Sequence, residues 1–122
     1  MRFATFLLCA LLLSGCVTTA PRQYQWGSYE DMLYAGYKDT TKMDALKSGL
    51  EIQIAQLEKS QQKVAPGLYA ELGTLYVQGG LSDKAVVMYG RERDTWPESK
   101  GLMEAMIKNL GRSKVSAEGS AK

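Results

Sequence analysis

The sequence predicts an all-α fold of about five helices that pack as antiparallel hairpins. Three observations support this prediction. Apolar residues recur at the spacing of one helix face in several segments. Glycine, proline or cap residues separate these segments. The connections between them are short, and short connections force consecutive helices to pack antiparallel. With 122 residues and only three Pro, the chain accommodates one small helical domain.

The first helix is expected at Tyr29–Tyr37. Ser28 precedes it as the expected N-cap, and Glu30 and Asp31 fall in its first turn, where the helix dipole favours negative charge. Four apolar residues recur at the spacing of one helix face: Tyr29, Met32, Leu33 and Tyr37. This stripe predicts that one side of the helix is buried.

The second and third helices carry the clearest apolar patterns. The second begins near Thr41 and fades in the polar run Glu58–Lys63. Its stripe consists of Met43, Leu46, Leu50, Ile54 and Leu57. Pro66 suits the first turn of the third helix, and Gly79 and Gly80 end it. The third stripe consists of Leu68, Leu72, Leu75 and Tyr76.

The last two helices are also predicted from their cap and stop residues and from their apolar residues. Ser82 is the expected cap of the fourth, and Pro97 stops it because proline cannot continue the hydrogen-bond ladder. The fifth, at Glu98–Leu110, is expected to end at Gly111, before a disordered tail at 112–122. The apolar residues are Ala85, Val86 and Tyr89 on the fourth helix, and Leu102, Met103, Met106, Ile107 and Leu110 on the fifth.

Residues 1–15 indicate a secretory signal peptide, because Arg2 precedes the apolar run Phe3–Leu13, which is well short of the roughly 20 residues of a membrane span. The following Leu13-Ser14-Gly15-Cys16 resembles the lipobox of bacterial lipoproteins, which implies acylation of Cys16. Val17, rather than Asp, after this residue implies export to the outer membrane. Residues 16–25 are then a flexible tether. An ordinary signal peptide with a chance cysteine, or a buried helix, is the alternative.

The third and fourth helices together resemble one tetratricopeptide (TPR) repeat. Seven positions match its pattern: Tyr69, Leu72, Gly73, Tyr76, Ala85, Tyr89 and Pro97. Small residues at Gly73 and Ala85 allow the two helices to approach closely. Glu92 stands where another small residue is expected, so the fifth helix is predicted to be a cap. The first two helices match the pattern weakly. The expected domain is a stack of TPR-like hairpins at 26–111.

The segment Tyr24-Gln25-Trp26-Gly27-Ser28-Tyr29, followed by Leu33-Tyr34, is similar to the opening of a family of small bacterial lipoproteins. Members of that family tend to accompany a lipoprotein similar to the curli secretion channel. The resemblance implies a place in an assembly of the cell envelope, with a channel-type lipoprotein as the candidate partner.

The composition argues against several classes of function. The net charge of +2 argues against a nucleic-acid binder, and the chain has no His, no Gly-rich phosphate loop and no metal-spaced cluster. We therefore expect neither catalytic residues nor a metal, cofactor or small-molecule substrate. Carboxylate pairs such as Glu30/Asp31 and Glu71/Glu92 are expected on solvated helix faces, with an acid–base pair as the alternative.

Two sets of residues are candidates for partner binding. Tyr24 and Trp26 are either an aromatic anchor, at lipid headgroups or in a partner's pocket, or a staple folded onto the first two helices. The TPR resemblance implies a concave face formed by first helices of hairpins. On this sequence that face comprises Asp31, Ala35, Lys38, Ala70, Thr74, Val77 and Gln78. A plain solvated surface is the alternative.

The methionines that follow Cys16 also allow two interpretations, an adaptable binding groove or filling of the core. They are Met32, Met43, Met88, Met103 and Met106. Four of them fall on the predicted apolar stripes, which favours the core.

Together these features predict a lipid-anchored adaptor at the outer membrane, facing the periplasm, that binds another envelope protein. A pilotin-like escort of a channel subunit, an enzyme acting on peptidoglycan or lipid, and a purely structural or surface-displayed protein are the alternatives.

Overall fold

The computed structural model describes residues 23–120, and no strand occurs within them. The predicted signal peptide, Cys16 and the tether up to residue 22 lie outside the described residues. The helices are α2 (Tyr29–Lys38), α3 (Met43–Lys59), α4 (Leu68–Gln78), α5 (Ser82–Thr95) and α6 (Lys100–Ser120). Short 3-10 turns, Thr40–Lys42 and Pro97–Ser99, precede α3 and α6. The all-α prediction is confirmed.

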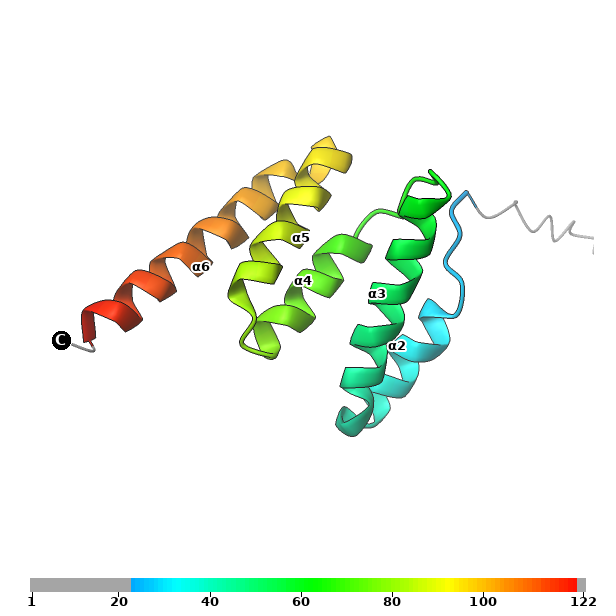
Figure 1. Ribbon diagram of the computed structural model, residues 1–122, viewed down its shortest axis with the longest axis horizontal. Helices are drawn as coiled ribbons and strands as arrows, with labels where there is room; N and C mark the ends of the chain where they lie inside the picture. Colours follow the sequence, from blue (N-terminus) through cyan, green and yellow to red (C-terminus); the bar gives the residue numbers. More distant parts are fainter. Residues whose placement is uncertain (1–22, 121–122) are drawn as a thin grey trace, which may run out of the picture.

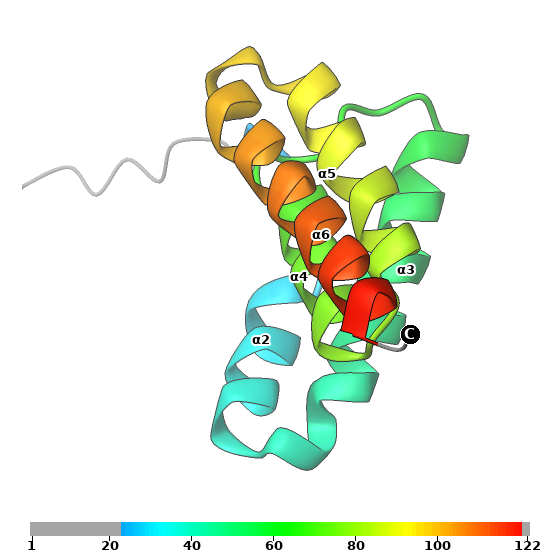
Figure 2. The ribbon, with the colours of Figure 1, turned by 90° about the vertical axis from the view of Figure 1, so that its left-hand side faces the viewer.

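The helices form a row in which each contacts its neighbour in the chain. Contacts join α2 to α3, α3 to α4, α4 to α5 and α5 to α6, and successive helices run in opposite directions (Figure 1). Figure 2 shows the first hairpin, α2 with α3, closed at its lower end by the turn around residues 38–43. The two ends of the row are α2 and α6. None of the helices within residues 23–120 is both long and apolar enough to cross a membrane.

One hydrophobic core runs through the row. Its buried members come mainly from α3, α4 and α5: Leu46, Leu50, Ile54, Leu57, Val64, Ala65, Leu68, Tyr69, Leu72, Leu75, Tyr76, Ala85, Met88, Tyr89 and Met103. The stripes predicted for the second and third helices are confirmed, because every member is buried or packs against this core. The methionines fill the core as the apolar spacing favoured. Met88 and Met103 are buried, and Met32, Met43 and Met106 pack against the core from its edge.

Two aromatic or aliphatic positions predicted to be buried are exposed. Tyr37 on α2 is 71% exposed and Leu102 on α6 is 64% exposed. On α2 the buried position belongs to Gly36, where a Cβ would lie 3.1 Å from Met43 and 3.4 Å from Leu46. The absence of a side chain at Gly36 lets α2 lie flat on the start of α3, and this turns Tyr37 towards solvent.

The helix starts differ from the predicted caps. Ser28 and Ser82 make no capping hydrogen bond, and Ser82 is itself the first residue of α5. Asp39 provides a side-chain cap before α3, since its carboxylate accepts from the N–H and the hydroxyl of Thr41 at 3.0 and 2.7 Å. Pro66 precedes α4 rather than lying in its first turn, because Gly67 adopts a left-handed conformation (φ 91°) at the N-cap.

The last helix is longer than predicted. Gly111 does not end it, and α6 continues to Ser120. The segment 112–120, predicted to be disordered, is therefore helical, and residues 121–122 lie outside the described part. Contacts on the extension stabilise it. The Ser113 hydroxyl donates to the carbonyl of Asn109 at 3.1 Å, and Lys114 pairs with Asp83 of α5 at 3.2 Å.

The close crossing of α4 and α5 depends on Gly73. A Cβ at this position would lie 2.7 Å from Cε1 of Tyr89, and that ring is almost fully buried. Ala85 on the facing helix is fully buried. The missing side chain of Gly73 therefore allows α4 and α5 to approach closely, as predicted for this position.

We predict that Gly73→Ala destabilises the fold by about 1–3 kcal/mol, since the ring of Tyr89 has to shift within a packed core. The matched control is Gly101→Ala in α6, where a Cβ meets no atom within 4 Å. This control is expected to be neutral or to stabilise by up to about 1 kcal/mol. Urea unfolding monitored by circular dichroism measures both. Equal stability of the two variants would contradict the packing explanation.

Candidate functional site

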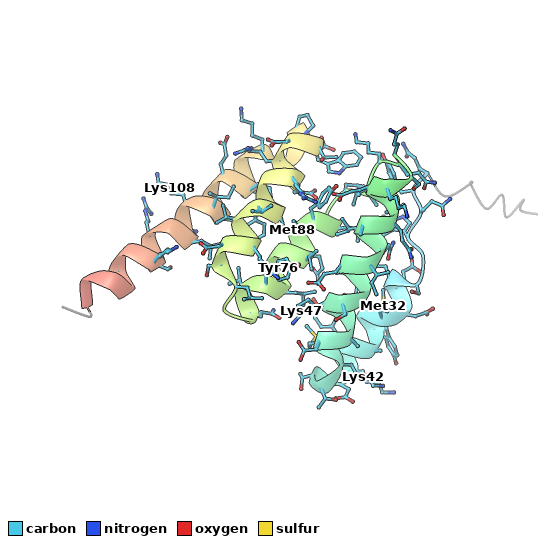
Figure 3. All side chains as sticks on the ribbon, viewed as in Figure 1. Met32, Lys42, Lys47, Tyr76, Met88 and Lys108 are labelled. Carbon is cyan, nitrogen blue, oxygen red and sulfur yellow. The ribbon has the colours of Figure 1, made fainter. Side chains whose placement is uncertain are left out.

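Two tyrosine–glutamate hydrogen bonds join the first hairpin (α2 and α3) to the second hairpin (α4 and α5). The Tyr76 hydroxyl on α4 donates to Glu51 on α3 at 2.6 Å, and the Tyr69 hydroxyl donates to Glu58 at 2.8 Å. The two glutamates lie about two turns apart on α3, and the two tyrosines lie about two turns apart on α4. The two hydrogen bonds therefore form a ladder along the α3–α4 interface. Figure 3 shows Tyr76 extending from α4 towards α3. The repeat pattern predicted these tyrosines as space-filling residues. It did not predict their polar partners.

The ladder extends to the next helix and shifts the tyrosine pKa values. Arg91 on α5 pairs with Glu58 at 2.7 Å. Burial, followed by the hydrogen bond to Glu51, raises the pKa of Tyr76 to about 12. Burial and the carboxylate of Glu58 likewise raise the pKa of Tyr69 well above its ordinary value. These shifts show that the folded chain favours the protonated, donating form of both hydroxyls.

Glu92 lies inside the fold rather than on a solvated face, so that expectation is wrong for this residue. Its side chain is 1% exposed. The Oε1 atom accepts the N–H of Gly67, at the start of α4, at 2.8 Å, and the hydroxyl of Ser99 at 3.3 Å. The Oε2 atom is buried and has no hydrogen-bond partner among the described residues. Glu92 thus connects α5 with the starts of α4 and α6.

Glu71, the other member of the suggested acid–base pair, is half-buried on α4. Burial raises the pKa of its carboxyl. Glu71 lies in the first turn of α4, whereas the carboxylate of Glu92 binds the backbone that precedes that helix. Each carboxylate therefore has a structural environment of its own, and no hydrogen bond joins the two within residues 23–120.

The segment 23–28, which we call the strap, packs back onto the domain. Trp26 stacks beside Tyr29 at 5.7 Å between ring centroids, as the staple interpretation predicted. Tyr24 instead meets Trp96, at the end of α5, edge to face at 5.6 Å. Lys63 covers the Trp96 ring at 3.6 Å. In Figures 1 and 2 the strap begins at the same edge of the molecule as the α3–α4 and α5–α6 connections.

The α4 part of the predicted concave face is largely closed. Ala70, Thr74 and Val77 are half-buried, and only Gln78 is exposed. The Thr74 hydroxyl donates to the carbonyl of Ala70 at 3.0 Å and lies 3.2 Å from the hydroxyl of Tyr89, so it points into the hairpin. Gln78 lines a hollow of about 160 Å³ between α3 and α4. This part of the face offers little side-chain surface to a partner.

The α2 part is open. Asp31 and Lys38 are exposed and Ala35 is half-buried. Tyr34, at the same helical spacing, is 69% exposed, and the Lys38 ammonium lies 5.8 Å from its ring. We call the residues Asp31, Tyr34, Ala35, Tyr37 and Lys38 the α2 face. Both tyrosines were missed as surface residues. Tyr37 was assigned to a buried stripe, and Tyr34 was noted only in the segment that resembles the opening of a lipoprotein family.

The described residues contain no group of three or more His, Cys, Asp and Glu placed to hold a metal ion. A family model described as "Domain of unknown function (DUF4810)" matches residues 23–106, from the strap into α6. No curated protein and no solved structure matches the chain.

The tyrosine–glutamate ladder predicts a loss of stability at alkaline pH. The pKa of Tyr76 is about 12 in the folded chain, against an ordinary value of 10.0. The contribution of Tyr76 to the free energy of unfolding is therefore fully present below pH 10 and is lost as the pH rises towards 12. Tyr76→Phe should therefore reduce the dependence of the unfolding free energy on pH between 9 and 11.5. Tyr34→Phe, which removes an exposed hydroxyl, is the control and should retain the wild-type slope. A wild-type slope in Tyr76→Phe would contradict the assignment.

Removing Glu92 should be far more costly than removing an exposed carboxylate. Glu92→Ala leaves the Gly67 N–H without its acceptor and opens a cavity, so we expect a loss of about 3 kcal/mol. Glu92→Gln keeps an acceptor oxygen and should lose less. Glu98→Ala, at an exposed position, should change stability by less than about 0.5 kcal/mol. Denaturant midpoints of the three variants provide the measurement. A mild effect of Glu92→Ala would show that this contact is dispensable.

Proposed function

We propose that this chain, which belongs to the DUF4810 family, is a lipid-anchored adaptor of the outer membrane that holds another cell-envelope protein close to the bilayer. The hairpin stack, in this proposal, is of the tetratricopeptide kind and binds its partner without catalysing a reaction. The partner is an envelope protein, with a channel-type lipoprotein as the first candidate.

The anchor is supported by the sequence that precedes the described residues. Leu13-Ser14-Gly15-Cys16 has the residue types that lipoprotein processing requires, and the only other cysteine is Cys9, within the proposed leader. The chain between Cys16 and residue 23 reaches about 24 Å when extended. Acyl chains on Cys16 would hold the domain within this distance of the bilayer. This confinement raises its effective concentration towards neighbouring envelope proteins.

The main support for a binding role is the pair of exposed tyrosines on α2. Tyr34 and Tyr37 are 69% and 71% exposed on the helix that ends the row. Tyrosine is enriched at protein interfaces because its ring buries a large area at a small entropy cost while its hydroxyl stays hydrogen-bonded. Asp31 and Lys38 flank the pair with one charge of each sign, which suits specific recognition of a folded partner.

Site-specific photocrosslinking in cells tests this proposal. A photoreactive residue in place of Tyr34 should capture one defined envelope protein. The same residue in place of Leu102, which is similarly exposed on α6 at the other end of the row, should not. Cys16→Ser should reduce capture at position 34 at least tenfold, since the domain then lacks its membrane anchor.

Equal capture from both positions, or none from position 34, would contradict the proposed binding face. The location of the captured protein in cells that lack this chain separates an adaptor from an escort. An adaptor leaves its partner in the outer membrane, whereas the loss of an escort leaves the partner elsewhere.

A further inference from the structure

Two adjoining hollows lie along the outer face of α3, on the side of the strap. Their volumes are about 300 and 220 Å³. Gly27, Gln53 and Gln56 line both hollows, so the hollows adjoin each other, and we call the two together the α3 groove. Figure 1 shows the chain just before α2 running beside the upper half of α3. The groove belongs to neither part of the predicted concave face.

The lining of the α3 groove carries no charge. Asp, Glu, Lys and Arg make up 23% of the chain, yet none of them lines either hollow. Four of the eleven residues that line the two hollows are glutamines, which come from the strap, from α3 and from the connection that follows α3: Gln25, Gln53, Gln56 and Gln62. A glutamine amide has a donor NH2 group and an acceptor oxygen. The NH2 group of Gln53 donates to the strap, so this residue offers its oxygen as an acceptor. No aromatic residue lines the hollows, so the groove has no flat ring on which a sugar could stack.

One wall of the groove is a single stripe of α3. The helical residues that line it recur at the spacing of one helix face: Gly49, Ile52, Gln53, Gln56, Leu57 and Ser60. From the first to the last, this stripe is about 16 Å long at 1.5 Å per residue. An extended peptide of about five residues covers the same length. Ile52 is 60% exposed and provides an apolar contact within the stripe.

The strap forms the opposite wall and is held in place. The amide nitrogen of Gln53 donates to the carbonyl of Trp26 at 2.7 Å and to that of Gln25 at 3.2 Å. Gly27 adopts φ 55°, a conformation that favours glycine, and a Cβ there would contact Gln53 at 3.4 Å. These contacts hold the strap against α3 at Gln53, where the two hollows meet.

We propose that the α3 groove binds an extended, uncharged peptide segment of a partner protein. Amide side chains on both walls pair with the N–H and C=O groups of an extended main chain, as a neighbouring strand would. A charged residue in the segment would lose hydration and gain no counter-charge. The inference rests on the proposed function for the source of this segment, which is the envelope partner, and it adds a second contact to the α2 face.

A peptide library tests the inference. The probe is a mixture of acetylated, amidated hexapeptides built from uncharged residues, and a second mixture carries Lys or Glu at the third position. The full-length chain, purified from membranes in detergent and immobilised, should retain the uncharged mixture at least tenfold better, as measured by mass spectrometry. Gln56→Lys should reduce retention at least tenfold, and Ile52→Ser severalfold. Gln78→Lys, the same substitution on the predicted concave face, should leave retention unchanged.

Equal retention of the two mixtures would overturn the inference, as would equal loss of retention in Gln56→Lys and Gln78→Lys. Capture of an N-acetylglucosamine tetramer, lost in Gln56→Lys, in place of peptides would make the groove a glycan site and would also overturn it. Circular dichroism melting shows whether each variant is folded. If these tests fail while position 34 still captures a partner, only this inference falls. If the groove retains peptides but position 34 captures no partner, the proposed α2 face falls instead.

Discussion

A buried carboxylate at the junction of three helices organises this fold. Glu92 sits on α5 with 1% exposure, and its oxygen binds the backbone N–H of Gly67 before α4 and the hydroxyl of Ser99 before α6. Burying a polar group is costly unless hydrogen bonds replace those that it made with water, and the Oε1 atom of Glu92 has such bonds. The N-terminus of α4 supplies one such bond, together with the positive end of a helix dipole. One residue thereby fixes where α4 and α6 begin relative to α5.

The contacts around Glu92 lie in the second hairpin and α6, whereas the proposed binding surfaces lie on the first hairpin. Glu92 joins α5 to the starts of α4 and α6, the crossing at Gly73 packs α4 against α5, and the tyrosine–glutamate ladder joins α4 to α3. The first hairpin carries the strap, the α2 face and the α3 groove. The proposed anchor joins the chain at the strap. A partner held by the first hairpin would therefore lie next to the tether, with the rest of the row as its support.

Local patterns predicted much of this fold. The leucine spacing of α3 and the repeat positions of α4 and α5 located three helices and most of the core, because burial on one helix face is a periodic signal. The same signal failed on α2, where Gly36 rather than Tyr37 faces the core, since periodicity does not show where a missing side chain lets helices approach. Glycine alone also proved a poor stop signal at Gly111, where the flanking residues favour a helix.

The surfaces were harder to predict because they depend on contacts between distant residues. Tyr24 meets Trp96, and Gln53 holds the carbonyls of the strap, although these partners are far apart in the chain. The environment of Glu92 is equally non-local. Sequence spacing marked this residue as a departure from the repeat pattern. It could not show that the departure places a carboxylate at a helix start, or that an uncharged groove lies beside α3.

In the proposed function, acyl chains on Cys16 hold this helical domain at a bilayer. Metabolic labelling of cells with a palmitate analogue, followed by mass spectrometry of the N-terminal peptide, tests the anchor. We expect a mature chain that begins at Cys16 and carries the label, and a Cys16→Ser chain that does not carry it. An unlabelled wild-type chain, or one cleaved at another position, would show that Cys16 does not anchor the domain.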